Sequence, residues 1–177
     1  MKLVVLDRDG VINEDSPDHI RSPKAWRPLP GSLEAIARLS QSGYRVVVAS
    51  NQSGIGRGLF NYDELFGIHE KLQRLVGELG GRIDGIFFCP HVDADQCECR
   101  KPAPGLFREI GRRLQVDLTG VPAIGDSRRD LAAARAAGAQ PILVRTGNGA
   151  VTERDYPAEI GGVDIHDDLA SAANALI

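Results

Sequence analysis

The 177-residue sequence predicts an α/β fold with a mostly parallel sheet and helices on both faces. The first observation is that short apolar, β-branched segments alternate with amphipathic segments, joined by short connections. Repeated βα units of this kind build parallel sheets, because each crossover helix packs back on the sheet. The second observation is that polar residues follow the apolar segments where each strand should end. Ligands bind beyond the carboxyl ends of parallel strands, so we expect a single active site there.

The expected strands are short runs that are apolar at nearly every position. Such runs are typical of strands that are buried on both faces. They are expected at residues 3–6, 44–49, 82–88, 121–124, 141–144 and, more weakly, 163–165.

The expected helices carry apolar residues at helical spacing. The first begins at Ser32, a suitable N-cap, and ends at Gly43. Further helices are expected over 63–79, 103–114 and 129–137, and from about 168 onwards. His69 lies near the apolar side of its helix, and we expect a structural role for it rather than a ligand role.

Length and composition suit one domain over residues 1–177, with 42% hydrophobic and 25% charged residues. The net charge of −3 argues against a nucleic-acid partner, which requires a basic face. No apolar run approaches the roughly 20 residues of a membrane span, and the apolar start is too short for a signal peptide. We therefore expect a cytoplasmic protein without membrane attachment. A monomer is also expected, although nothing in the composition determines the oligomeric state.

Two carboxylates, Asp7 and Asp9, end the first strand and precede Gly10. A carboxylate can attack phosphorus to form an aspartyl-phosphate, a role that suits Asp7. Asp9 can then protonate the leaving alcohol and later activate water. Asp126 follows the fourth strand and would complete a Mg²⁺ site with Asp7 and the Asp9 backbone carbonyl. The pattern therefore predicts phosphoryl transfer.

Positive charge and hydroxyl groups for the phosphate come from other strand ends. Ser50 can donate a hydrogen bond to a phosphate oxygen, and Arg100 and Lys101 supply positive charge. Asp130 is expected to orient the Asp126 loop or to join the metal ligands.

The three cysteines lie within one short loop, and this spacing indicates a metal site rather than a disulfide framework. Cys89, His91, Cys97 and Cys99 would complete a tetrahedral Zn²⁺ shell and leave no open position, so we expect a structural zinc. The alternative is ordinary buried cysteines beside a surface histidine. Because Arg100 and Lys101 follow directly, zinc would fix the angle at which they enter the site.

Four ordered motifs resemble those of the haloacid dehalogenase (HAD) superfamily. They are Asp7-Arg8-Asp9-Gly10-Val11, Ser50, Lys101 and Gly125-Asp126-Ser127-Arg128-Arg129-Asp130. Within it the chain resembles the D,D-heptose 1,7-bisphosphate phosphatases and the related histidinol-phosphatases, on the stretches 6–13, 50–58 and 89–102.

The resemblance implies a three-layer HAD-like (Rossmannoid) sandwich without a large cap domain, and therefore an open site. It implies Mg²⁺ held by Asp7, Asp9 and Asp126, with Ser50, Arg100 and Lys101 steadying the phosphoryl group. The positions that would contact substrate are Asp15, Ser16, Pro17, Asp18, Ser50, Asn51, Gln52 and Ser53. Ser127 stands where some relatives have a substrate-contacting lysine.

The resemblance implies that the substrate is a heptose 1,7-bisphosphate that loses its phosphate at carbon 7. Polar loops suit a polyhydroxylated ligand, and the chain is only 5% aromatic, too little to clasp a nucleobase. Arg57 and Arg128 are candidates for the remaining phosphate. Histidinol phosphate is the alternative substrate, and a non-enzymatic phospho-receiver module is the alternative class of protein.

Overall fold

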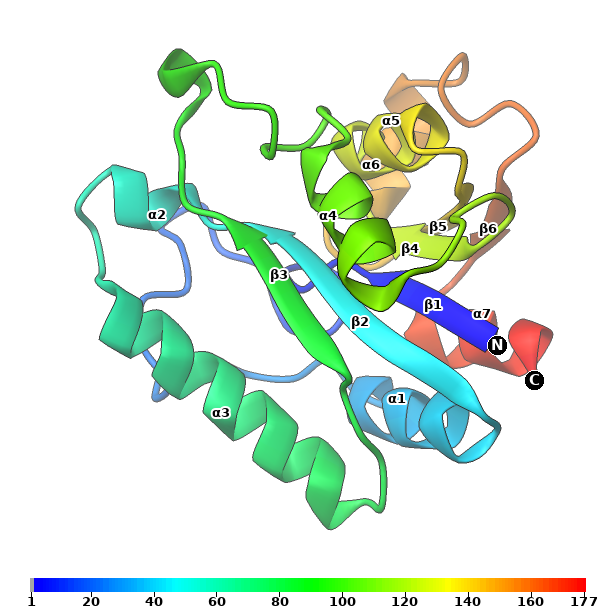
Figure 1. Cartoon of the computed structure of the whole chain (residues 1–177), viewed down its shortest axis with the longest axis horizontal. Helices are drawn as coiled ribbons and strands as arrows, with labels where there is room; N and C mark the ends of the chain where they lie inside the picture. Colours follow the sequence, from blue (N-terminus) through cyan, green and yellow to red (C-terminus); the bar gives the residue numbers. More distant parts are fainter. Residues whose placement is uncertain (1) are drawn as a thin grey trace.

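A computed structural model describes residues 2–177 as a three-layer α/β structure around a six-stranded sheet (Figure 1). All strand pairs are parallel, in the order β3-β2-β1-β4-β5-β6, which confirms the predicted sheet. The strands are β1 (Lys2–Leu6), β2 (Tyr44–Asn51), β3 (Gly85–Cys89), β4 (Pro122–Gly125), β5 (Gln140–Val144) and β6 (Asp164–His166).

Helices cover both faces of the sheet. α1 (Ser32–Gln41), α3 (Tyr62–Glu78) and α7 (Leu169–Leu176) lie on one face, and α4 (Gly105–Leu114) and α5 (Arg128–Ala136) lie on the other. Among residues 2–177 no helix is both long enough and apolar enough to cross a membrane.

The alternation of side chains along β1 explains the two cores. Val4 and Leu6 point to one face and pack with α1, α3 and α7, whereas Leu3 and Val5 point to the other and pack with α4 and α5. All four side chains are at least 96% buried, as expected for a central strand with helices on both sides.

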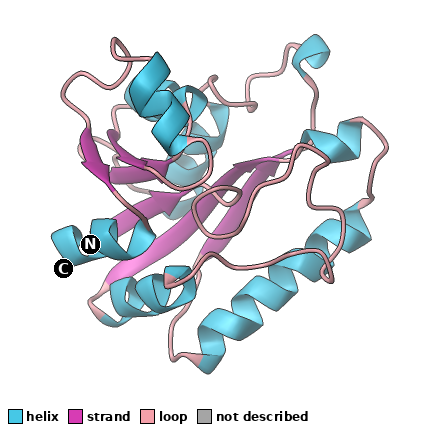
Figure 2. Cartoon of the chain, turned by 180° about the vertical axis from the view of Figure 1, so that it is seen from behind, coloured by secondary structure: helices cyan, strands magenta, loops and turns pink. Residues whose placement is uncertain are grey.

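The long loop between β1 and α1 has little regular structure but is firmly packed. Its Val11, Ile12, Ile20 and Trp26 are buried in the same core as α1 and α3. Seen from behind, Figure 2 shows long loops crossing this face beside the helices. The loop therefore packs against the same face of the sheet as α1 and α3.

Two short helices were not expected from the sequence. α2 (Ser53–Gly56) lies in the glycine-rich loop after β2, and α6 (Gly149–Asp155) lies after β5. Between β3 and α4 the structure places only a single 3-10 turn, Asp93–Asp95. The fold therefore carries no large cap, as the resemblance implied.

Candidate active site

The site lies where the strand order changes direction. β1 pairs with β2 on one side and with β4 on the other, so the loops after β1 and β4 diverge around a crevice. Asp7 follows β1, Asp126 follows β4, and Ser50 and Asn51 end β2. The parallel sheet thus brings together residues that lie more than a hundred positions apart in the chain.

Lys101 is the central cation of this crevice. Its side chain is only 3% exposed, and its Nζ lies 2.9 Å from Asp7 Oδ1 and 2.7 Å from Asp130 Oδ1. The Ala49 carbonyl oxygen accepts a third bond, 2.7 Å from Nζ. Burial alone lowers the pKa of Lys101, but the Asp130 and Asp7 carboxylates outweigh this and raise it above the usual value. The ammonium group therefore stays charged beside Asp7.

Asp130 holds the Asp126 loop in place, as expected. Its Oδ2 accepts hydrogen bonds from the backbone N–H groups of Asp126 (3.1 Å) and Ser127 (3.0 Å), and from the Ser127 hydroxyl (2.9 Å). Ser127 in turn caps α5 in a capping box with Asp130. The Ser127 hydroxyl is thereby engaged within the chain.

Asp126 is held between two glycines. A Cβ atom on Gly10 would lie 2.1 Å from Asp126 Oδ2, and one on Gly147 would lie 2.3 Å from it. Both glycines have positive φ, at +84° and +57°. Asn148 donates from its backbone N–H to Asp126 Oδ2 over 2.8 Å. The backbone atoms of Gly10 and Gly147 therefore approach the Asp126 carboxylate more closely than they could if either residue carried a side chain.

Asp9 is held by hydrogen bonds on both of its carboxylate oxygens. Arg8 Nε and Asn13 Nδ2 each donate to its Oδ1 over 2.9 Å, and Gln52 Nε2 donates to its Oδ2 over 3.1 Å. Burial raises the pKa of Asp9, but the Arg8 guanidinium and these hydrogen bonds bring it below the usual range.

The donor set fits a divalent cation. One carboxylate oxygen each from Asp7, Asp126 and Asp130 lie within 4.8 Å of one another. Burial and the Asp130 charge raise the pKa of Asp7 to about 7, and burial with Asp130 and Asp7 raises that of Asp126. Crowded carboxylates of this kind are relieved by a hard cation such as Mg²⁺. Because Asp130 already binds Lys101 and two amides, Asp7 and Asp126 are the carboxylates best placed to hold it.

A polar cavity of about 60 Å³ joins these groups. Of the residues expected at the site, eight line it, namely Asp7, Asp9, Asp15, Asn51, Lys101, Asp126, Ser127 and Asp130. A neighbouring hollow of about 320 Å³ is lined by Asp15, Ser16, Pro17, Gly147 and Asn148. The two cavities share Asp15 and Asn148, so the second is a natural place for the rest of a substrate.

Other expected residues are placed around the cavity without lining it. Ser50 is fully buried, and Gln52 Nε2 donates to its hydroxyl over 2.7 Å. Ser53 begins α2 and is buried, while Asp18 and Arg57 are exposed. Arg100 forms an ion pair with Asp93.

Arg128 lies 3.4 Å from Glu159 and stacks over the Tyr156 ring. Its neighbour Arg129 lines the cavity instead. Asn148 also lines it, although the sequence analysis did not single it out. Its position in a polar loop directly after β5 was the available signal. The helix that begins at the next residue, Gly149, has no apolar periodicity. The sequence therefore did not reveal a helix here, nor that the loop before it lies at the site.

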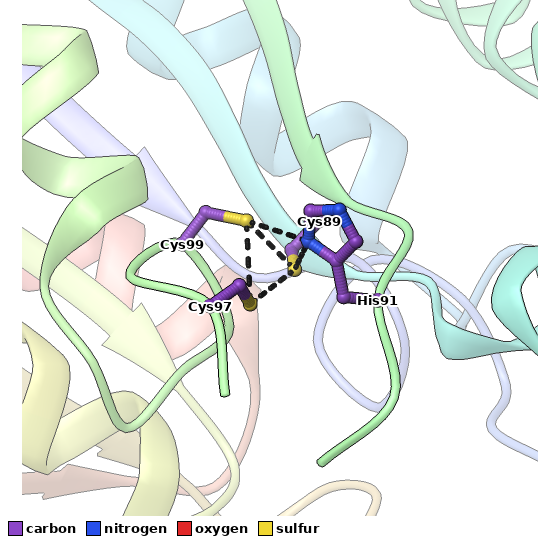
Figure 3. A group of neighbouring side chains, drawn as sticks. All are labelled: Cys89, His91, Cys97 and Cys99. Atoms are coloured by element: carbon purple, nitrogen blue, oxygen red, sulfur yellow. Dashed lines mark hydrogen bonds between the residues drawn. The ribbon is translucent and has the colours of Figure 1, made fainter. Parts of the chain in front are cut away.

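The cysteine loop forms a compact cluster (Figure 3). Cys89 Sγ lies 3.6 Å from Cys97 Sγ and 2.9 Å from Cys99 Sγ, and Cys97 and Cys99 are 3.7 Å apart. His91 directs Nδ1 at the sulfurs, 3.5 Å from Cys89 and 3.3 Å from Cys99. All three cysteines are free of disulfides.

The 3.6 Å and 3.7 Å sulfur pairs match a tetrahedral zinc site, whereas Cys89 and Cys99, 2.9 Å apart, would separate by about 1 Å around the ion. Around Zn²⁺ with sulfur bonds of about 2.3 Å, neighbouring sulfurs lie about 3.8 Å apart. Burial raises the pKa of Cys97, but the Arg100 N–H and the other thiols bring it down to about 7. The cluster has the ligand types, number and arrangement of a closed structural zinc site, as expected from the sequence. Arg100 and Lys101 leave this cluster directly.

Comparisons with known proteins agree with this chemistry. Residues 98–172 match the HAD-hydrolase-like family model, and residues 2–132 match the polynucleotide kinase 3 phosphatase model. D-glycero-beta-D-manno-heptose-1,7-bisphosphate 7-phosphatase from Bordetella bronchiseptica is 52% identical over 100% of this chain and 98% of its own. The enzyme of the same name from Pseudomonas aeruginosa is 51% identical over 99% and 97%.

Solved structures give the same result. The crystal structure of the B. bronchiseptica D,D-heptose 1,7-bisphosphate phosphatase, complexed with magnesium and phosphate, has a TM-score of 0.93. It is 53% identical and covers 99% of this chain and 98% of that chain. The phosphatase from Burkholderia thailandensis has a TM-score of 0.76 at 46% identity, over 99% and 98%.

Proposed function

Because the chain belongs to the family of D-glycero-β-D-manno-heptose-1,7-bisphosphate 7-phosphatases, we propose that it hydrolyses the 7-phosphate of this sugar bisphosphate. The single observation that carries the proposal is the crevice at which Asp7, Asp9 and Asp126 meet around Lys101. The reaction would belong to the biosynthesis of nucleotide-activated heptose for lipopolysaccharide core or a related glycan.

The chemistry follows from the positions of the side chains. Asp7 attacks phosphorus and forms an aspartyl-phosphate, while the bond from phosphorus to the sugar oxygen breaks. Asp9 is ionised in the free protein, and the negative charge of a bound phosphate raises its pKa so that it takes up a proton. It then gives this proton to the leaving oxygen, and later takes a proton from the water that hydrolyses the aspartyl-phosphate. Lys101, charged and 2.9 Å from Asp7, offsets the negative charge that gathers there. Inorganic phosphate and the sugar monophosphate are released.

Mg²⁺ would be held by Asp7, by Asp126 and by the backbone carbonyl of Asp9. It would supply positive charge that stabilises the phosphoryl group during transfer. Support comes from the raised pKa values of Asp7 and Asp126, because burial and the neighbouring carboxylates outweigh the cations nearby, Lys101 beside Asp7 included. Zn²⁺ would be held separately by the cysteine cluster, as a structural ion.

Substrate recognition would come from the loops around the crevice. The hollow lined by Asp15, Ser16, Pro17 and Asn148 offers hydrogen-bonding groups for sugar hydroxyls. The phosphate on carbon 1 needs a cation. Arg129 now joins Arg57 and Arg128 as a candidate, since it lines the cavity whereas Arg128 is paired with Glu159.

We also propose that the chain acts as a monomeric, single-domain enzyme in the cytoplasm. The carboxylates and the lysine that line the cavity all come from one chain. Free cysteines gathered as metal ligands suit a reducing compartment.

The test is a comparison of kcat/KM for heptose 1,7-bisphosphate and histidinol phosphate on one preparation with Mg²⁺. We expect the bisphosphate to be much the better substrate, because histidinol phosphate lacks a second phosphate. Single Arg57→Met, Arg128→Met and Arg129→Met variants then identify the cation that binds this phosphate. Equal or better turnover of histidinol phosphate would overturn the substrate and leave the phosphatase mechanism intact.

A 3′-phosphorylated oligonucleotide belongs in the same comparison, because one matching family model describes a polynucleotide phosphatase. The net charge of −3 and the acidic crevice predict poor turnover of this polyanion.

A further inference from the structure

Arg8 and His69 form a buried contact that the roles described above do not use. Arg8 separates the two catalytic aspartates in sequence, yet its side chain has no exposed surface. Arginine is almost never fully buried unless it is paired. Its Nε lies 2.9 Å and its Nη2 lies 2.8 Å from the same oxygen, Asp9 Oδ1. Its Nη1 lies 3.2 Å from His69 Nε2.

His69 is the acceptor in this contact. A guanidinium group has donors only, so the ring nitrogen that faces it must be unprotonated. His69 is 7% exposed and lies on α3, a helix that holds no other part of the site described above. Burial and the Arg8 charge lower the pKa of His69 to about 3, so the ring is neutral at neutral pH. α3 therefore supports Arg8 from behind.

Arg8 determines which oxygen of Asp9 is free to carry a proton. Two nitrogens of Arg8 and the Asn13 amide all converge on Oδ1, whereas Oδ2 receives the Gln52 amide over 3.1 Å. Oδ1 accepts hydrogen bonds from Arg8 Nε and Asn13 Nδ2, which occupy both of its lone pairs, and Arg8 Nη2 adds positive charge 2.8 Å away without a hydrogen bond of its own. The proton of the acid is therefore carried on Oδ2.

We propose that His69 is a positioning residue for proton transfer, holding Arg8 against Asp9 Oδ1 so that Oδ2 faces the leaving oxygen of the substrate. This inference rests on the proposed role of Asp9. When the bond from phosphorus to oxygen breaks, its electron pair stays on the leaving oxygen, which takes the proton from Oδ2. If residue 69 cannot accept a hydrogen bond from Arg8, the guanidinium group is free to move. The Asp9 carboxyl group then turns away from the leaving oxygen.

Leaving-group dependence distinguishes this role from a merely structural one. A sugar alkoxide needs a proton to leave, whereas p-nitrophenolate leaves without one. We compare kcat/KM for the best alkyl phosphate of the substrate comparison with kcat/KM for p-nitrophenyl phosphate, since kcat/KM reports the step in which the leaving group departs. His69→Leu should lower the alkyl value by about 10- to 100-fold, a part of the 10²–10⁴-fold typical of general acids. The aryl value should change less than about threefold.

Three further variants complete the experiment. His69→Gln places an acceptor near the position of Nε2 and should restore most of the alkyl activity. Leu72→Ala truncates a buried residue of the same helix and should leave the ratio of the two values unchanged. Asp9→Asn should lose much more kcat/KM on the alkyl phosphate than on p-nitrophenyl phosphate, and this difference should be the largest of all the variants. If His69→Leu does not fold, His69→Ala, which leaves room for water, is measured and interpreted in the same way.

The outcomes separate the two proposals. The role of His69 alone would be overturned by one result. The folded His69 variant would lose equal kcat/KM on both substrates, while Asp9→Asn would still lose more on the alkyl phosphate. If Asp9→Asn lost equal kcat/KM on the two substrates, the role of Asp9 would be overturned, and the role of His69 with it.

Discussion

Asn51 and Lys101 exchange two hydrogen bonds of 3.0 Å. Asn51 Nδ2 donates to the Lys101 carbonyl oxygen, and the Lys101 backbone N–H donates to Asn51 Oδ1. The pair joins the end of β2 to the end of the cysteine loop. The lysine backbone is thus fixed next to the zinc cluster on one side and by Asn51 on the other, while its ammonium group binds Asp7.

Asn51→Ala should therefore lower activity by loosening Lys101. A displacement of about 1 Å at a catalytic group can cost about 100-fold in rate, and we expect a loss of 10- to 100-fold in kcat. Steady-state kinetics measure it. Asn174→Ala, on the exposed side of α7, is the matched control and should behave as wild type. An unchanged kcat in Asn51→Ala would show that Lys101 is positioned without this pair.

Asp7→Asn should abolish turnover and leave the fold nearly intact, because an amide cannot attack phosphorus. Asp9→Asn should lose about 10²–10⁴-fold through loss of the proton donor. Circular dichroism checks the fold and phosphate release checks the activity, with Asp164→Asn, an exposed aspartate of β6, as the control. Wild-type turnover by Asp7→Asn would refute the covalent mechanism.

The contribution of Asp7 to the stability of the metal-free protein should fall as pH rises, and Mg²⁺ should cancel that fall. Burial and Asp130 raise the pKa of Asp7 from 3.8 to about 7. A group that binds its proton more tightly in the folded state loses stability as pH passes from its unfolded to its folded pKa. Asp9 and Asp130 have lowered pKa values and stay ionised above pH 5, so they do not oppose this trend. His69, whose pKa is lowered from 6.5 to about 3, does oppose it up to about pH 6.5, but it lies outside the carboxylates that would hold Mg²⁺. The Asp7 contribution is therefore isolated by comparing each pH with and without Mg²⁺.

Thermal unfolding at pH 5.5 and pH 8, with and without Mg²⁺, tests this expectation. The rise in Tm on adding Mg²⁺ should be several degrees larger at pH 8, since about 1 kcal/mol shifts Tm by about 2–4 °C in a domain of this size. Asp7→Asn should reduce the difference. An equal Mg²⁺ effect at both pH values would contradict the expectation.

Metal analysis of freshly purified protein should find one zinc per chain. Structural zinc contributes about 10–16 kcal/mol in finger peptides, but here a folded sheet already tethers Cys89. A strong chelator should therefore disorder the loop and lower activity, through Lys101, while far-UV circular dichroism keeps the signal of the core. Protein that never contains zinc would count decisively against the site.

The parts of the site that the sequence predicted are those that its local pattern encodes. Asp7 and Asp126 stand directly after apolar runs, so the strand ends revealed them. The cysteine spacing similarly revealed the metal cluster.

What sequence reasoning missed depends on contacts between distant segments. Arg8 looks like an exposed charge between two acids, and its burial depends on His69, 61 positions later. Helix α6 was missed because it has no apolar periodicity. Its Thr152 hydroxyl donates a hydrogen bond of 2.9 Å to the distant Asp126 carbonyl oxygen. Which of Arg128 and Arg129 faces the cavity depends on how α5 is rotated about its axis. A short alanine-rich helix has no clear apolar stripe from which that rotation could be predicted.

The two glycines around Asp126 have a consequence for mutational tolerance. In a scan of all substitutions, most positions rank replacements by size or polarity. At Gly10 and Gly147 even the single methyl of alanine would occupy the space of the Asp126 carboxylate, and positive φ adds strain. Alanine and tryptophan should therefore be about equally damaging there, so that these two loops stand out as positions where every replacement fails alike.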